Sequence, residues 1–186
     1  MNNGKAFKSW KDTENKTRRI AWVVFWAVSL GWFFTMSLSA QTKGQKLPGI
    51  KIKDLSGKSV DISKYSENGK MTVISFWATW CLPCKKELNN ISELYEEWVE
   101  DYNVEVVAIS IDDSRNASKV TSYINGQGWE FDVLLDANSD LKRALNFQTV
   151  PYTLLVDAKG EIVYRHTGYV EGDEYILEDE IIKFGK

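Results

Sequence analysis

The feature that most constrains the fold is the run Met71–Trp77, which is mostly apolar and rich in β-branched and aromatic residues. A run of this kind, without alternation of polar and apolar residues, predicts a strand that is buried on both faces. Such a strand lies inside a sheet that carries helices on both sides. The rest of the chain therefore has to supply further strands and two layers of helix.

The segments around this run alternate between strand and helix patterns. Apolar residues recur at helical spacing from Leu88 to Val99, and acidic and basic residues occupy the rest of that surface. The other expected strands are two hairpins and two single strands, at 50–53 with 59–62, 104–111, 131–135, and 153–157 with 161–165. The other expected helices cover about 115–125, 138–145 and 173–183. This order predicts an α/β protein, a three-layer α/β/α sandwich with a mixed central sheet.

Charge is distributed unevenly along the 186 residues. Residues 1–40 hold six lysines and arginines and two acids, which leaves 17 basic and 24 acidic residues in 41–186. An acidic body argues against nucleic acid as a partner. Two cysteines are too few for a disulfide-stapled scaffold, and a single histidine excludes a multi-histidine metal site.

Residues 20–38 are almost entirely apolar and lie in a segment without charged side chains. At about 1.5 Å per residue this helix would just cross a hydrocarbon core of about 30 Å. Basic residues precede it, which predicts a cytoplasmic N-terminus and an extracytoplasmic body. The run exceeds the usual signal-peptide core of about 7–15 residues, which favours an anchor. Small residues at 37–41 keep a cleaved signal peptide open as the alternative, in which case the body is periplasmic or secreted.

The predicted domain organisation follows from these patterns. Residues 1–40 form a cytoplasmic lead with the transmembrane anchor or signal peptide, and residues 41–48 form a short polar linker. Residues 49–186 form one folded domain.

Cys81 and Cys84 stand where the buried strand ends and the helix begins. One helical turn brings the two sulfurs close enough for a disulfide, and the helix N-terminus stabilises a thiolate. The thiolate is the nucleophile of disulfide exchange. We expect Cys81, the more exposed of the two, to attack a disulfide of another protein. Cys84, one turn into the helix, should then resolve the mixed disulfide.

A metal site or a second reactive centre has much weaker support in the sequence. A zinc site needs about four ligands, whereas the chain offers two cysteines and the distant His166. His166 lies among alternating residues and is interpreted as a surface or sheet-packing residue. The acids between Glu171 and Glu180 are interpreted as the solvated face of a helix. We expect no metal and no organic cofactor.

The stretch 76–88, FWATWCLPCKKEL, resembles the thioredoxin superfamily, and within it the TlpA/ResA-like thiol-disulfide oxidoreductases, which are membrane-anchored or periplasmic. The resemblance covers about residues 47–183. It includes a hairpin before the first core strand, a βα insertion over about 104–135, and a glutamate three residues after the second cysteine, here Glu87. It implies a thioredoxin-like fold for the predicted three-layer sandwich.

The resemblance also implies roles for individual residues. Cys81 and Cys84 match the redox pair, and Trp80 matches the aromatic residue beside the nucleophile. Pro151 matches the cis-proline that lies against the disulfide. Val150, just before it, would offer its backbone to an extended client peptide.

Four further positions either match the family pattern or depart from it. Glu87 matches the acid implicated in tuning the redox pair, with a solvated helix residue as the alternative interpretation. Ser75 stands where thioredoxin has a buried aspartate, so Glu87 or water must accept the proton of the resolving cysteine. Asn89 replaces a helix-kinking proline, which should leave the helix straighter. Tyr152 follows the cis-proline position, where threonine is common, and is expected to narrow the client groove.

The resulting functional hypothesis is an extracytoplasmic protein thiol-disulfide oxidoreductase. The resemblance implies a reductant of client disulfides that is fed by a membrane thiol donor, with apocytochrome c before haem attachment as an expected client. Two alternatives stay open: a thiol peroxidase of the same superfamily, and a metallochaperone domain that binds Cu(I) through the two thiolates.

Overall fold

The strand predicted at Met71–Trp77 lies within a seven-stranded mixed sheet in the computed structural model, which describes residues 44–185. The strand order is β2-β1-β5-β4-β3-β6-β7. β4 is parallel to both β3 and β5, whereas β1 with β2, β1 with β5, β3 with β6, and β6 with β7 are antiparallel. The predicted thioredoxin-like α/β fold is confirmed.

The elements follow the predicted order closely. The strands are β1 (Lys51–Asp54), β2 (Ser59–Asp61), β3 (Met71–Trp77), β4 (Val104–Ser110), β5 (Asp132–Leu135), β6 (Tyr152–Val156) and β7 (Ile162–Thr167). The α-helices are α2 (Leu82–Tyr102), α3 (Ala117–Ile124), α4 (Asp140–Leu145) and α5 (Asp173–Phe184). A short 3₁₀ helix, η1 (Ile62–Ser66), was not expected, because a single turn of five residues leaves no periodic pattern in the sequence.

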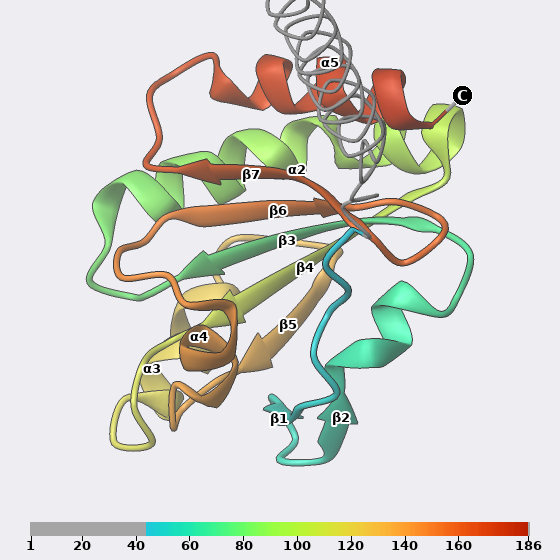
Figure 1. Cartoon of the computed structure of the whole chain (residues 1–186). Coiled ribbons are helices and arrows are strands. Elements are labelled where there is room, and N and C mark those ends of the chain that lie inside the picture. Colours follow the sequence, from blue (N-terminus) through green and yellow to red (C-terminus); the bar gives the residue numbers. More distant parts are fainter. Residues whose placement is uncertain (1–43, 186) are drawn as a thin grey trace, which may run out of the picture. The chain divides into compact units, whose positions relative to one another are not determined.

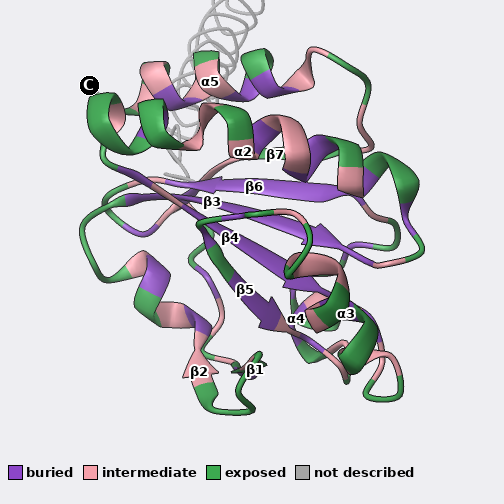
Figure 2. Ribbon diagram, turned by 180° about the vertical axis from the view of Figure 1, so that it is seen from behind, coloured by how far each residue is buried: buried purple, intermediate pink, exposed green. Residues whose placement is uncertain are grey.

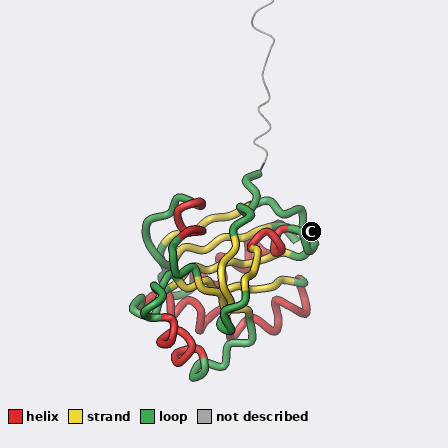
Figure 3. The backbone as a smooth tube through the Cα atoms, turned by 90° about the horizontal axis from the view of Figure 1, so that it is seen from below, coloured by secondary structure: helices red, strands yellow, loops and turns green. Residues whose placement is uncertain are grey.

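Helices cover both faces of the sheet. On one face α2 and α5 lie side by side and contact each other (Figure 1). Figure 3 shows the strands together as one layer with the helices beside it. The central strands β3 and β6 are buried along their whole length, as Figure 2 shows. This burial explains their unbroken apolar sequences, because both faces contact side chains rather than water.

The sheet separates two hydrophobic cores. The core on the α2 side contains both cysteines together with residues from α2, α3, α5 and the sheet, among them Val73, Trp77, Leu88, Ile91, Trp98, Val120 and Leu177. The core on the α4 side contains residues from η1, α4 and the opposite face of the sheet, among them Ile62, Phe76, Leu141, Phe147, Tyr152 and Leu154. We call these the α2-side core and the α4-side core.

The chain enters the domain beside the hairpin of β6 and β7. Lys46 forms an isolated antiparallel bridge with Glu161, and the Ile162 N–H donates to the Gln45 carbonyl at 2.8 Å. Leu47 is buried in the α4-side core. Packing therefore begins before the predicted domain start at residue 49, and residues 45–47 are not part of a free linker. The leader predicted over residues 1–40, its membrane segment 20–38, and residues 41–43 of the linker lie outside the described residues.

Within residues 44–185, no helix is both long enough and apolar enough to cross a membrane.

Candidate functional site

The two cysteines form a disulfide at the start of α2, with their Cα atoms 5.4 Å apart. Cys81 is the N-cap residue of the helix, and its sulfur accepts a hydrogen bond from the Cys84 N–H at 3.3 Å. Pro83 lies in the first helical turn, where its missing N–H leaves no partner unsatisfied. The Cys81 sulfur thus lies at the positive end of the helix dipole, which stabilises a thiolate when the bond is reduced.

The surroundings of the disulfide are apolar and partly accessible. Cys81 is 5% exposed and Cys84 is fully buried. Beside them Trp80 and Leu82 are 70% and 76% exposed, which is unusual for side chains of this size. Together they offer a hydrophobic surface next to the more accessible sulfur.

The loop that carries Cys81 is held by Asp112, a buried residue just after β4. The Asp112 carboxylate accepts hydrogen bonds from the Thr79 N–H at 2.8 Å and from the Thr79 hydroxyl at 2.7 Å. It also accepts one from the Ser110 hydroxyl at 2.8 Å. This contact joins residues 33 positions apart and was not predicted from the sequence. The carboxyl ends of parallel strands meet at one edge of a sheet, so the place of Asp112 after β4 was the available signal.

Glu87 is buried against the sheet rather than solvated, so the alternative that it is a surface helix residue is wrong. The side chain is 5% exposed and lies one turn after Cys84 on α2. Its carboxylate accepts hydrogen bonds from Ser75 Oγ at 3.0 Å and from Thr153 Oγ1 at 2.6 Å. Ser75 occupies the position of the buried aspartate in thioredoxin. Its hydroxyl thus donates to Glu87, the residue expected to accept the proton in place of that aspartate.

Burial raises the pKa of the Glu87 carboxyl to about 7. The hydrogen bonds from Thr153 and Ser75 act in the opposite direction, and the nearby charges of Asp173 and Glu174 raise the pKa further. A carboxyl of this kind can take up and release a proton near neutral pH. Residues three apart on a helix lie on the same face, so Glu87 and Cys84 share one face of α2.

The peptide bond between Val150 and Pro151 is cis. The Pro151 carbonyl accepts a hydrogen bond from the Gly168 N–H at 2.9 Å, which fixes the loop after β7 beside the proline. Val150 is half-buried and packs against both cores. Tyr152 does not face a client groove as expected: it is buried in the α4-side core and stacks on Phe147 with ring centroids 4.3 Å apart.

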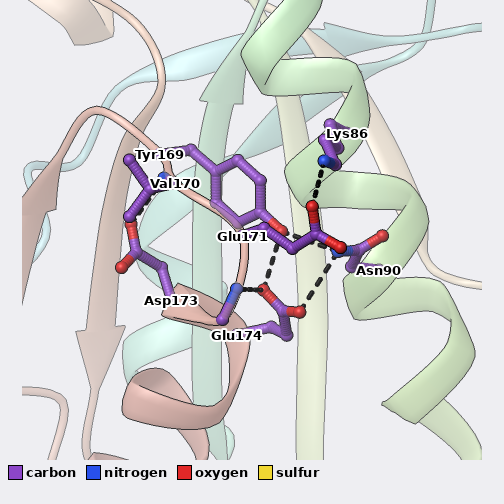
Figure 4. Close-up of polar contacts among 8 residues, drawn as sticks. Lys86, Asn90, Tyr169, Val170, Glu171, Asp173 and Glu174 are labelled. Atoms are coloured by element: carbon purple, nitrogen blue, oxygen red, sulfur yellow. Dashed lines mark hydrogen bonds and ion pairs between the residues drawn. The ribbon is translucent and has the colours of Figure 1, made fainter.

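The connection between β7 and α5 is fastened to α2 by polar contacts (Figure 4). Asn90 on α2 donates to the Tyr169 hydroxyl oxygen at 2.6 Å and to Glu174 at 3.1 Å, and Tyr169 donates to Glu174 at 2.7 Å. Lys86 pairs with Glu171 at 2.5 Å on the surface. Glu174 is buried, so the interpretation of the acids from Glu171 to Glu180 as a wholly solvated face is wrong at this position.

Among the described residues 44–185, no group of three or more His, Cys, Asp or Glu side chains is arranged to hold a metal ion.

A disulfide at the start of the helix after β3, together with a cis-proline just before the neighbouring strand β6 in a sheet of this topology, defines a thioredoxin-fold thiol-disulfide oxidoreductase. Residues 43–165 match the AhpC/TSA family model, and the chain belongs to that family as a TlpA/ResA-like member of the thioredoxin superfamily. It is similar to the thiol-disulfide oxidoreductase ResA of Bacillus subtilis, with 31% identity over 68% of each chain.

Solved structures agree with this assignment. A thioredoxin-like protein from Porphyromonas gingivalis shares 44% identity over 74% of this chain and 90% of that one, with a TM-score of 0.67. StoA from Bacillus subtilis shares 27% identity over 71% of this chain and 98% of that one, with a TM-score of 0.57. The chain is therefore a protein-disulfide oxidoreductase. The individual roles of Cys81, Cys84, Glu87, Trp80, Val150 and Pro151 stay predictions.

Proposed function

We propose that this protein is a reductant of client disulfides on the extracytoplasmic side of a membrane. A membrane thiol donor supplies its electrons, and apocytochrome c before haem attachment is a client. Residues 20–38 provide the membrane anchor. The exposed side chains of Trp80 and Leu82 contact the client beside Cys81.

The observation that carries the direction of transfer is the buried carboxyl of Glu87 one turn from the buried Cys84. A disulfide becomes a strong oxidant when its reduced thiolate form is stabilised. A buried negative charge next to Cys84 disfavours the thiolate of that residue. The reduced form gains less stability here, so the pair gives up its electrons readily.

The reaction has two exchange steps. The Cys81 thiolate attacks one sulfur of the client disulfide, and the other client sulfur leaves with the bonding electron pair. Cys84 then loses its proton to the Glu87 carboxylate and attacks Cys81 Sγ. The Cys81–Cys84 bond forms, the second client sulfur leaves as a thiolate, and the client has gained two electrons.

The first test is the reduction potential of the full chain. The protein is equilibrated with glutathione or dithiothreitol mixtures, and free thiols are counted by alkylation and mass. A potential of about −270 mV or lower supports the reductant. A potential near about −120 mV identifies a disulfide donor and overturns the proposal.

The client is tested with a Cys84→Ser variant, which retains Cys81 and cannot resolve the mixed disulfide. An oxidised peptide that contains the haem-attachment sequence Cys-x-x-Cys-His should remain covalently bound to it. The matched control, Cys81→Ser, should capture none. A wild-type turnover of peroxide faster than that of the peptide would instead favour the peroxidase, and tight equimolar Cu(I) binding would favour the metallochaperone.

A further inference from the structure

Glu87 borders a small cavity on the side of the sheet that carries α2 and α5. The cavity has a volume of about 10 Å³, close to the minimum that admits one water molecule. Its polar walls come from four elements, namely Glu87 on α2, Thr153 on β6, His166 on β7, and Asp173 and Glu174 on α5. A water needs two to four polar partners, and these side chains can supply them.

His166 is joined to the Glu87 site through the sheet. It is paired in register with Thr153, so the two side chains lie next to each other on the same face. The Thr153 hydroxyl donates to Glu87 at 2.6 Å. The imidazole therefore lies one residue away from the hydrogen bond that holds the buried carboxyl.

Asp173 fixes the imidazole of His166. The distance from His166 Nε2 to Asp173 Oδ2 is 3.1 Å. The same oxygen accepts the Val170 N–H at 2.8 Å, and Figure 4 shows Asp173 beside Val170. An ionised carboxylate can only accept hydrogen bonds, so Nε2 donates and Nδ1 is the nitrogen that can take up a proton. Histidine is the side chain that changes charge most readily near neutral pH.

Glu87 and His166 also differ in their exposure to solvent. Glu87 is buried, whereas the side chain of His166 is 35% exposed and that of Asp173 is 14% exposed. The Glu87 carboxyl is therefore much less accessible to bulk water than the His166 imidazole.

We propose that His166, oriented by Asp173, is a positioning residue that carries the Glu87 proton between the protein interior and the solvent. This inference rests on the proposed role of Glu87 as the acceptor of the Cys84 proton. After Cys84 has attacked Cys81, the Glu87 carboxyl holds the proton. The proton passes through one water in the cavity to His166 Nδ1, and from there to solvent, which leaves Glu87 ionised for the next turnover.

The charges around the cavity couple these two protons. Tyr164 and His166 face it from β7, and Asp173 and Glu174 face it from α5. The hydroxyls of Ser75 on β3 and Thr153 on β6 donate to Glu87. The Asp173 charge raises the pKa of Glu87. A protonated His166 next to Asp173 offsets part of that charge.

The test is the pH profile of oxidation of the reduced full chain by oxidised glutathione, from about pH 5 to about pH 9. A positioned proton transfer contributes about 10²- to 10⁴-fold to a rate, and a group one step removed should contribute less. His166→Ala should therefore slow the reaction near neutral pH by about tenfold, and added imidazole should restore it. Arg165→Ala is the matched control, because Arg165 precedes His166 on β7 but bonds Gln45 instead.

The remaining variants separate the proton relay through His166 from the role of Glu87 as acceptor of the Cys84 proton. Glu87→Gln should be slow, and adding His166→Ala to it should cause no further loss, because both act on one proton. If the histidine variant has the wild-type profile while Glu87→Gln is slow, the relay is overturned and the role of Glu87 stands. If Glu87→Gln is also fast, the role of Glu87 fails with it. If His166→Ala is slow and imidazole does not restore its rate, the relay is overturned. If His166→Ala does not fold, His166→Gln takes its place.

Discussion

The two sides of the sheet handle buried carboxyl groups in different ways. On the α2 side, Glu87 accepts hydrogen bonds from the hydroxyls of Ser75 and Thr153. At the start of α4, Asp136 accepts them from the backbone N–H groups of Leu141 and Lys142, at 3.2 and 2.9 Å. Burial raises the pKa of both carboxyls, so the difference lies in their partners.

This difference decides which carboxyl can exchange a proton without losing hydrogen bonds. A hydroxyl can turn and accept a hydrogen bond when the carboxyl becomes protonated, whereas a backbone N–H can only donate. Glu87 therefore keeps its hydrogen bonds in both protonation states. Asp136 loses at least one when it is protonated, and it serves the helix rather than the chemistry. If Glu87 has its proposed role, the α2 side combines stability with proton exchange, whereas the α4 side stabilises the fold alone.

The largest expected effect on stability tests the α4 side. Phe147→Ala removes a ring that is stacked on Tyr152 at 4.3 Å and lies 4.6 Å from Phe76. The free energy of unfolding should fall by about 3–5 kcal/mol, as for other buried aromatic deletions. Urea denaturation measures this loss. The rate of disulfide exchange per folded molecule should be unchanged, and a change in its pH profile would break the division between the two sides.

The next effect tests Glu87 by its pH dependence. The pKa in the folded state, about 7, lies above the ordinary value of 4.5, so the folded protein binds more protons between these pH values. Stability from this group is therefore present at low pH and is lost as pH rises through about 7. Glu87→Gln cannot ionise and should be more stable than the wild type by about 3 kcal/mol above that pH.

The measurement is urea denaturation of both proteins at about pH 4.5 and about pH 8. The difference between them should nearly vanish at the lower pH. Glu93→Gln removes an exposed charge from the same helix and serves as the control, with no pH-dependent difference expected. Equal stabilisation by both variants would show that general repulsion on the acidic surface, rather than burial of Glu87, is responsible.

The smallest expected effect concerns an exposed ion pair between α2 and the loop before α5. Lys86 and Glu171 form a short ion pair, but their side chains are 52% and 75% exposed. An exposed pair of this kind contributes about 0–1 kcal/mol. Lys86→Ala should therefore change the free energy of unfolding by less than about 1 kcal/mol, and a double-mutant cycle with Glu171→Ala measures the coupling. A larger coupling would mean that the loop before α5 depends on this contact.

Most of the fold could be predicted from the sequence, because buried strands carry apolar runs and the helices carry periodic ones. The predicted strand at Met71–Trp77 has the observed bounds, and β4 differs from its predicted range by one residue. The cysteine pair could be predicted equally well, because its spacing and its position at a strand-to-helix junction define its geometry.

The surroundings of the pair could not be predicted with the same certainty, because they depend on contacts between distant segments. Glu87 follows two lysines and has the local sequence of a surface residue, yet Ser75 and Thr153 enclose it from two strands. Asp112 reaches Thr79 across 33 residues. His166 gains its partner Asp173 only because the intervening loop turns back onto β7.

The bridge between Lys46 and Glu161 also fixes the end of the domain at which the preceding chain joins it. The hairpin that contains Glu161 follows Val156, which pairs with Thr72 at the start of β3. Cys81 follows the opposite end of β3, about 20 Å along the strand. The chain before Gln45 therefore joins the domain at the end of β3 opposite to the end that leads to Cys81.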